Sequence, residues 1–153
     1  MATFYSVEAT KFTTPSVEGF VRGTDLGGKL RVSFFTYNFA GTEATNDTIV
    51  LTKVPQGARI LGVYVANEDC GTTVTVDIGD SDDTDRLVDD AAWGTAAAAF
   101  ATLRRDDTET DETPTLGFGY RYSAETNILA TLASVSTPTA NATVRGYVMY
   151  AVE

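Results

Sequence analysis

Short runs of alternating apolar and polar residues recur along the chain, and they constrain its fold more than any other feature. In the clearest run, TTVTVDIG, Val74, Val76 and Ile78 alternate with threonine and aspartate. Successive side chains of a β-strand point to opposite faces, so this pattern predicts a strand with one face in a core. Other runs typical of strands, separated by turn-rich segments, occur at residues 29–39, 47–54, 60–66, 116–123, 126–134 and 142–153.

These runs predict an all-β fold with seven or eight short strands, in an antiparallel β-sandwich of jelly-roll type. Val144, Val148 and Tyr150 alternate with Arg145 and Tyr147, so the chain is expected to end in a strand. The short segment NEDCG, between the runs 60–66 and 70–79, has the length of a hairpin connection.

Two further segments complete the predicted organisation. Residues 1–28 are polar, threonine-rich and without a sustained period, so we expect an extended N-terminal arm followed by a single β-sandwich domain over 29–153. Residues 89–105 are alanine-rich and compatible with one short helix of two or three turns, with Asp89 or Asp90 as N-cap. At most one short helix is therefore expected.

The formal net charge of −10 is concentrated in one part of the chain. Residues 77–112 hold 12 of the 21 acidic residues and three of the 11 basic ones. Nucleic acids and anionic membrane surfaces select positively charged proteins, so neither is an expected partner. No apolar run is long enough to span a bilayer, and the N-terminus shows no signal-peptide pattern.

The chain contains no histidine, which is the commonest general base and metal ligand in proteins. Its single cysteine, Cys70, has no histidine to activate it and no second cysteine to pair with. We therefore expect no enzymatic activity and no cofactor.

The stretch VDIGDSDDTDR, residues 76–86, poses the question of a metal site or a hairpin tip. An EF-hand loop that starts at Asp80 would need glycine at position 6 and glutamate at position 12, where this chain has Asp85 and Ala91. A different calcium site would draw on Asp80, Asp82 and Asp85.

The preferred interpretation of this stretch is a structural loop. Gly79 would let the chain turn, and Asp80 and Asp82 would accept hydrogen bonds from backbone amides of their own turn. Arg86 would pair with Asp80 or Asp83. Such exposed pairs are worth only ~0.2–1 kcal/mol each.

Aromatic residues suggest two surfaces. Tyr37, Phe39 and Tyr147 share strands with core residues but are expected to point away from the core, so they are candidates for the interface of a homo-oligomer. Trp93, with nearby tyrosines, would instead serve as a stacking platform if the protein bound carbohydrate. Exposure of the Trp93 ring separates the two interpretations.

Residues 48–88 resemble a pattern found among structural proteins of tailed bacteriophages. The pattern is a strand, a Pro-x-Gly-Ala turn with an apolar strand, and a Thr/Val strand that ends in Ile-Gly-Asp and Asp-Arg. The matching positions are Pro55, Gly57, Ala58, Ile60, Val76, Ile78, Gly79, Asp80, Asp85 and Arg86.

This resemblance implies a head-associated protein that decorates, or cements, the outer surface of a capsid. It implies a β-sandwich, often a trimer, that binds the major capsid protein where capsomers meet, in virions built from proteins made in the host cytoplasm. It supplies no catalytic motif. The alternatives are a carbohydrate- or receptor-binding module of head-fibre type, or a structural protein of the tail or neck.

Overall fold

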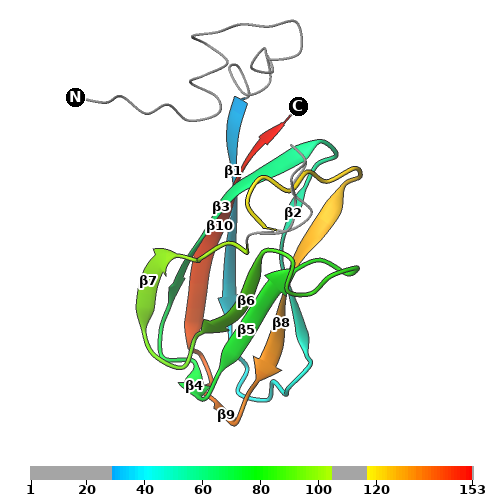
Figure 1. The fold of residues 1–153 in the computed structure, drawn as a ribbon. Helices are drawn as coiled ribbons and strands as arrows, with labels where there is room; N and C mark the ends of the chain where they lie inside the picture. The colour runs from blue at the N-terminus through cyan, green and yellow to red at the C-terminus, as the bar shows by residue number, and fades with distance from the viewer. Residues whose placement is uncertain (1–28, 105–116, 153) are drawn as a thin grey trace, which may run out of the picture.

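The computed structural model describes residues 29–104 and 117–152, which form two four-stranded antiparallel sheets packed face to face (Figure 1). The first sheet has the order β1 (Lys29–Asn38), β10 (Thr143–Val152), β3 (Ala58–Asn67) and β7 (Ala97–Phe100). The second has the order β2 (Thr48–Val54), β8 (Thr126–Ser134), β5 (Thr75–Gly79) and β6 (Val88–Ala92). The short strands β4 (Gly71–Thr72) and β9 (Thr137–Pro138) pair beside them.

The order of the eight main strands is nested. The first main strand pairs with the last (β1 with β10), the second with the seventh (β2 with β8), the third with the sixth (β3 with β7), and the fourth with the fifth (β5 with β6). This is the pairing expected of a jelly roll, in which one long antiparallel ribbon wraps into two sheets. The predicted all-β antiparallel sandwich is confirmed.

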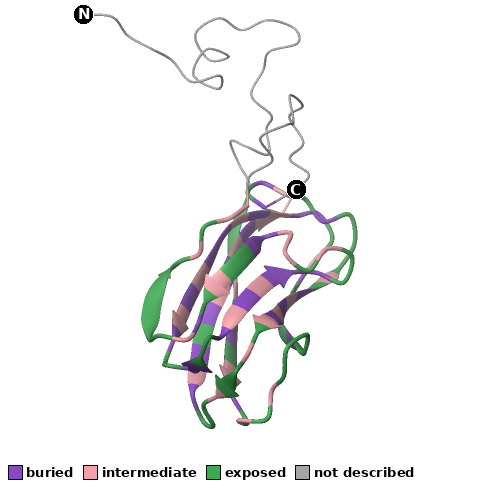
Figure 2. Ribbon diagram, turned by 60° about the horizontal axis from the view of Figure 1, so that its bottom comes forward, coloured by how far each residue is buried: buried purple, intermediate pink, exposed green. Residues whose placement is uncertain are grey.

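The core lies between the two sheets and follows the alternation of the strands. Val76 and Ile78 of β5 and Val144 and Val148 of β10 are fully buried, as their patterns predicted. In Figure 2, buried residues alternate with partly or fully exposed ones along most strands, whereas β7 is exposed along its length. The sandwich therefore shields one face of each sheet and leaves the other face of each to solvent.

The alanine-rich segment is not a helix. It forms strands β6 and β7, and no helix occurs in residues 29–104 or 117–152. Strand β7 pairs with the end of β3, and the buried side chain of Asn67 donates hydrogen bonds to the carbonyls of Trp93 (3.2 Å) and Thr95 (2.8 Å) between β6 and β7. These tertiary contacts outweigh the helix propensity of alanine, which is a weak preference.

Two expected local features also differ. Strands β3 and β5 do not form a hairpin, because β3 belongs to the first sheet and β5 to the second. Residues 117–122 form no long strand. Instead, the backbone amides of Gly119 and Tyr122 donate hydrogen bonds to the carbonyls of Ile60 and Ala58 at the start of β3.

Some predictions lie outside the described residues. The N-terminal arm at 1–28 and most of the acidic stretch that follows residue 104 belong to this group. In the part of the chain that the structure describes, no helix is long and apolar enough to cross a membrane.

Candidate functional site

The outward surface of the first sheet carries a row of four aromatic side chains, one from each strand. The register places Phe34 opposite Tyr147, Tyr147 opposite Tyr64, and Tyr64 opposite Phe100. The Tyr64 and Tyr147 rings stack with centroids 5.1 Å apart, and Phe34 meets Tyr147 edge-on at 5.7 Å. Both ends of the row are open to solvent, since Phe34 is 75% exposed and Phe100 57%.

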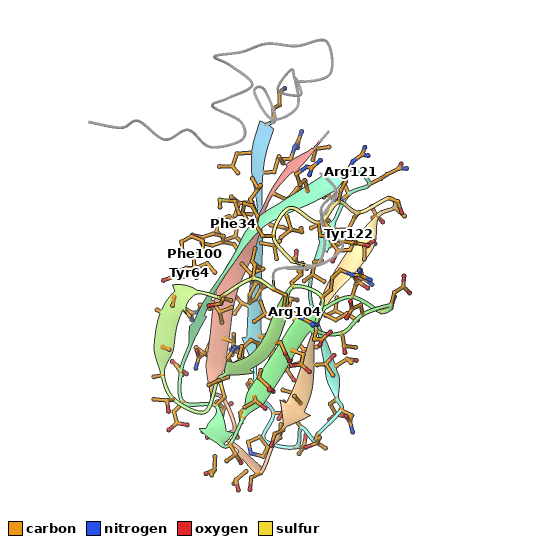
Figure 3. The ribbon with its side chains drawn as sticks, in the orientation of Figure 1. Phe34, Tyr64, Phe100, Arg104, Arg121 and Tyr122 are labelled. Atoms are coloured by element: carbon orange, nitrogen blue, oxygen red, sulfur yellow. The ribbon has the colours of Figure 1, made fainter. Side chains whose placement is uncertain are left out.

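Apolar side chains extend this row along the strands. Leu30 and Val32 of β1 are exposed, and Val32 lies opposite Met149 of β10. Figure 3 shows Phe34, Tyr64 and Phe100 together on one side of the sandwich, away from Arg104 and Tyr122. We call this surface the aromatic face, and it consists of Leu30, Val32, Phe34, Tyr64, Phe100, Tyr147 and Met149.

Strand β1 has apolar side chains on both faces, so alternation alone does not decide which face enters the core. Phe35 points inward and lies opposite Gly146 of β10. A Cβ atom at Gly146 would meet the Phe35 ring and the carbonyl oxygen of Tyr64. Glycine at this position therefore makes room for Phe35 in the core, and Leu30, Val32 and Phe34 are left outside.

The three predicted interface residues divide accordingly. Tyr147 does point away from the core, as part of the aromatic face. Phe39 is only 2% exposed, so the prediction that it faces outward is wrong: it directly follows β1 and enters the core on the same side as Phe35. Tyr37 is half-buried beside Phe39, and its hydroxyl donates a hydrogen bond to Glu43 at 2.8 Å. Burial and this hydrogen bond raise the pKa of Tyr37 to about 12.

A shallow hollow adjoins the aromatic row. One step along the strands, Arg145 of β10 lies opposite Ala66 of β3, which lies opposite Ala98 of β7. The small alanine side chains leave a hollow of about 480 Å³ in volume beside the large rings. Its lining residues are Ala66, Asn67, Glu68, Ala96, Ala97, Ala98, Thr143 and Arg145.

The aspartate stretch forms the tip of the β5–β6 hairpin, and Asp80 organises it. One carboxylate oxygen of Asp80 accepts hydrogen bonds from the backbone amides of Asp82 (2.9 Å) and Asp83 (3.1 Å). The other accepts from Nε of Arg86 at 2.6 Å, and Arg86 also lies 3.8 Å from Asp83. The predicted turn contacts of Asp80 and the predicted pairing of Arg86 are confirmed.

The expectation that this pair is exposed is wrong. Asp80 is only 3% exposed, and the Arg86 guanidinium is covered by the Tyr120 ring, whose centroid is 4.4 Å away. Gly79 is needed for close approach, because a Cβ atom there would collide with the carbonyl oxygen of Asp83. Burial raises the pKa of Tyr122 well above its usual value, and the nearby Asp80 carboxylate adds to the effect.

The three residues considered for an alternative calcium site, Asp80, Asp82 and Asp85, do not converge. The Asp80 carboxylate is engaged by Arg86, Asp82 is exposed, and the Asp85 carboxylate pairs with Arg104 at 2.7 Å. A shared hydrogen bond raises the pKa of Asp83 and lowers that of Asp85, whose charged form Arg104 also favours.

A different trio of carboxylates lies on β5 and β6. Carboxylate oxygens of Asp77, Asp89 and Asp90 lie within 4.8 Å of one another. Among the residues that the structure describes, these three have a spacing that could hold a cation. The backbone amide of Asp90 donates to Asp77 at 2.9 Å, so the trio is also part of the local hairpin structure. Exposed acidic groups of this kind are common without any ion.

Trp93 and Cys70 are both core residues. The Trp93 ring is 2% exposed, so the prediction that it provides an open stacking platform is wrong; its place between the sheets leaves no face for a sugar. Burial, together with Asp69 and Glu68, raises the pKa of the Cys70 thiol to about 11. A thiol in this state is a poor nucleophile at neutral pH.

Sequence reasoning missed two features. In the loop after β1, the Glu43 carboxylate accepts hydrogen bonds from the backbone amides of Ala40 (2.6 Å), Gly41 (2.9 Å) and Thr42 (3.1 Å). The aromatic row was also missed, since it depends on the register between four separate strands. The signals that were visible are the run FFTYNF and the single phenylalanine that ends the alanine tract.

Comparison with known proteins yields likeness in structure alone. No protein-family description and no curated protein sequence matches the chain. A chain of the "Cyanophage Pam1 capsid asymmetric unit" superposes with a TM-score of 0.66 and 24% identity, over 92% of this chain and 98% of that one. A chain of the "Capsid of Ralstonia phage GP4" does so with a TM-score of 0.64 and 17% identity, over 82% and 86%.

A third likeness is to a chain of the "Acidic stable capsid structure of Helicobacter pylori bacteriophage KHP30", with a TM-score of 0.50 and 14% identity over 82% of this chain and 90% of that one. The fold of this chain is therefore one found in chains of bacteriophage capsid structures. At the level of fold, the resemblance to head-associated phage proteins is confirmed.

Proposed function

We propose that this protein is a structural protein of a bacteriophage virion that decorates and stabilises the outside of the capsid. The observation that carries the proposal is the likeness to a chain of a phage capsid asymmetric unit over nearly the whole length of both chains. Because 98% of that chain is matched, it is a small sandwich like this one, with no large additional domain.

In this proposal the protein binds the major capsid protein as a homo-oligomer, across the junctions between capsomers. A trimer is the state that the sequence resemblance favours. The aromatic face supports an assembled state, because an exposed contiguous apolar surface is typical of a protein–protein contact. The acidic β5–β6 side suits a surface that stays in solvent.

We also propose that the protein is not an enzyme. The Asp80 carboxylate is held by two amides and Arg86, and the Cys70 thiol is buried with a raised pKa. The carbohydrate-binding alternative loses its predicted platform, because Trp93 belongs to the core.

The test is co-sedimentation of the purified full chain with empty capsids of its own virus that lack it. We expect saturable binding to the capsids and an increase in the temperature at which they come apart, since a ligand that binds only the assembled shell stabilises it. A second sample without residues 1–28 shows whether that segment contributes to the binding.

Purified tails of the same virus serve as the comparison particle, and an unrelated acidic β-sandwich protein serves as the control for trapping in the pellet. Binding to tails but not to capsids would indicate a structural protein of the tail or neck instead. If the protein binds neither particle even when it is added in large excess over the capsids, the proposal is contradicted.

A further inference from the structure

The aromatic face is unusual for the outside of a β-sandwich. The solvent face of an antiparallel sheet normally carries polar residues in alternation with the buried ones. Here the row Phe34–Tyr147–Tyr64–Phe100 crosses the full width of the first sheet on its outside. The second sheet contrasts with it, because the outward positions of β5 and β6 include Asp77, Asp89 and Asp90.

The shape of the face is complementary to itself. The four rings form a ridge, and the alanine-lined hollow of about 480 Å³ lies directly beside that ridge. Along the same strands, Tyr147 is followed by Arg145, Tyr64 by Ala66, and Phe100 by Ala98. A second copy of the face carries a ridge of the same shape, which can enter this hollow.

The charges near the face suit an acidic partner, and a second copy is acidic. The four strands of the first sheet contain the basic residues Lys29, Arg31, Arg59 and Arg145 and no acidic residue. The other described residues include twelve acidic and four basic ones. Glu68 and Asp69 directly follow β3, so acids lie next to the face that another copy would contact.

The size of the face is adequate for a stable contact. Its three long strands have ten residues each. At ~3.4 Å per residue and ~4.8 Å between strands they cover ~500 Å² of sheet plane. The accessible area of the side chains on that plane is larger than the plane itself. For comparison, each partner contributes ~800 Å² of accessible surface to an interface of standard size.

We infer that the aromatic face is the contact between copies of this chain, with the ridge of one copy packed against the face of another. The inference rests on the proposed function, in which several copies act together on a shell, and it names the surface that joins them. Phe34 and Phe100, the two most exposed rings of the aromatic face, are the anchors of this contact.

The experiment measures the molar mass of the purified full chain by light scattering after size exclusion, across a dilution series and without capsids. We expect a whole multiple of the 16.3 kDa chain mass. The double variant Phe34→Glu with Phe100→Glu places charge at both ends of the row. It should raise the dissociation constant at least about thirtyfold and give a monomer at concentrations where the unmodified protein is assembled.

The matched control is Val50→Glu with Phe118→Glu. These two residues are each 61% exposed and lie outside the aromatic face, so the control introduces the same charge on equally exposed apolar residues. It should keep the mass of the unmodified protein. Circular dichroism should show the same β-rich spectrum for both variants. If the glutamate pair fails to fold, Phe34→Ser with Phe100→Ser repeats the test without charge.

A monomeric unmodified protein at 100 µM, or equal loss of assembly in the control, would overturn the inference. In that event, capsid binding or binding to polysaccharide that is lost in Phe34→Glu with Phe100→Glu would assign the face to the shell or to a sugar. The outcome is separable from the proposed function. An oligomer that is dispersed by the variant but does not bind capsids would leave this inference standing and remove the decoration role.

Discussion

Asp80 is the charged residue on which the β5–β6 hairpin depends most. Its buried carboxylate accepts hydrogen bonds from two backbone amides and the Arg86 guanidinium, so its removal breaks three hydrogen bonds at once. Asp80→Ala should lower the free energy of unfolding by about 3 kcal/mol, because it breaks a buried ion pair and removes the acceptor of two backbone amides. Urea denaturation at pH 7 measures the loss. The exposed neighbour Asp82→Ala should cost less than about 0.5 kcal/mol, and a similarly small loss for Asp80→Ala would contradict the assignment.

Glu43 makes the fold sensitive to acid. Burial opposes its ionisation, but hydrogen bonds from the backbone of Ala40 and the Tyr37 hydroxyl prevail and lower its pKa below the ordinary 4.5. A lowered pKa in the folded state gives stability that is fully present above the unfolded value. This stability is lost as the pH falls through the folded value.

Glu43→Gln should therefore destabilise the protein by about 1–2 kcal/mol at pH 7, and the difference from the unmodified protein should shrink below pH 4.5. Urea denaturation at several pH values measures it. Glu125→Gln is the control, since the Glu125 side chain is 64% exposed in its pair with Lys53. A difference for Glu43→Gln that persists unchanged in acid would count against a role for the carboxylate charge.

Local contacts were the predictable part at this scale. Asp80 and Arg86 are six residues apart within one loop, so turn chemistry and charge were enough to pair them. The role of Glu43 depends on the backbone path of residues 40–42, where several amides converge on one point. Nothing in the residue types of that loop specifies this path.

Among the strands, β10 carries the residue that decides the packing of β1. Gly146 leaves space for the Phe35 ring and for the carbonyl of Tyr64. Gly146→Ala should destabilise the protein by about 2–3 kcal/mol, because a methyl group there forces the ring and the backbone apart. Thermal or urea unfolding of the purified variant measures the change.

The control for this variant is Gly62→Ala on the neighbouring strand β3. A Cβ atom at Gly62 would meet the Met149 and Phe100 side chains at 3.4 and 3.5 Å, so an alanine fits with little adjustment. We expect the two glycine variants to differ by more than 1 kcal/mol in the free energy of unfolding. Equal losses would mean that glycine matters here for strand flexibility rather than for the space under Phe35.

Alternation predicted most of the strands but not their orientation in every case. β5 has one apolar face, which was assigned correctly, and Val144 and Val148 of β10 were also correctly placed in the core. β1 is apolar on both faces, so its orientation follows from Gly146, a residue more than a hundred positions away. The helix prediction for the alanine tract was wrong for a similar reason. Its conformation is decided by pairing with β3, and no residue within the tract specifies it.

At the scale of the whole molecule, the sandwich was predictable because most main strands carry the same apolar period, although β6 and β7 do not. The aromatic row was not, because it requires the register of three strand pairs, and Phe34 and Tyr147 are far apart in sequence. The residues of a surface assembled from four distant segments share no local motif.

The uneven charge of the molecule predicts a response to salt. With a net charge of −10, and seven acids against one base in residues 77–90, repulsion opposes the compact state. Screening should raise the melting temperature by a few degrees between 50 and 500 mM sodium chloride. Differential scanning fluorimetry measures it, with Asp89→Asn and Asp90→Asn together as the variant that should weaken the effect. A fall in melting temperature with salt would show that exposed ion pairs outweigh this repulsion.

The separate places of tryptophan and tyrosine give the molecule two optical signals. Trp93, the one tryptophan of the chain, lies in the core between the sheets, whereas Tyr64 and Tyr147 stack on the outside. Trp93 emission should shift to longer wavelength when the sandwich opens and stay constant when copies meet. The near-ultraviolet absorption of the stacked tyrosines should change when another molecule covers them. Folding and association can therefore be followed in one unlabelled sample, each by its own chromophore.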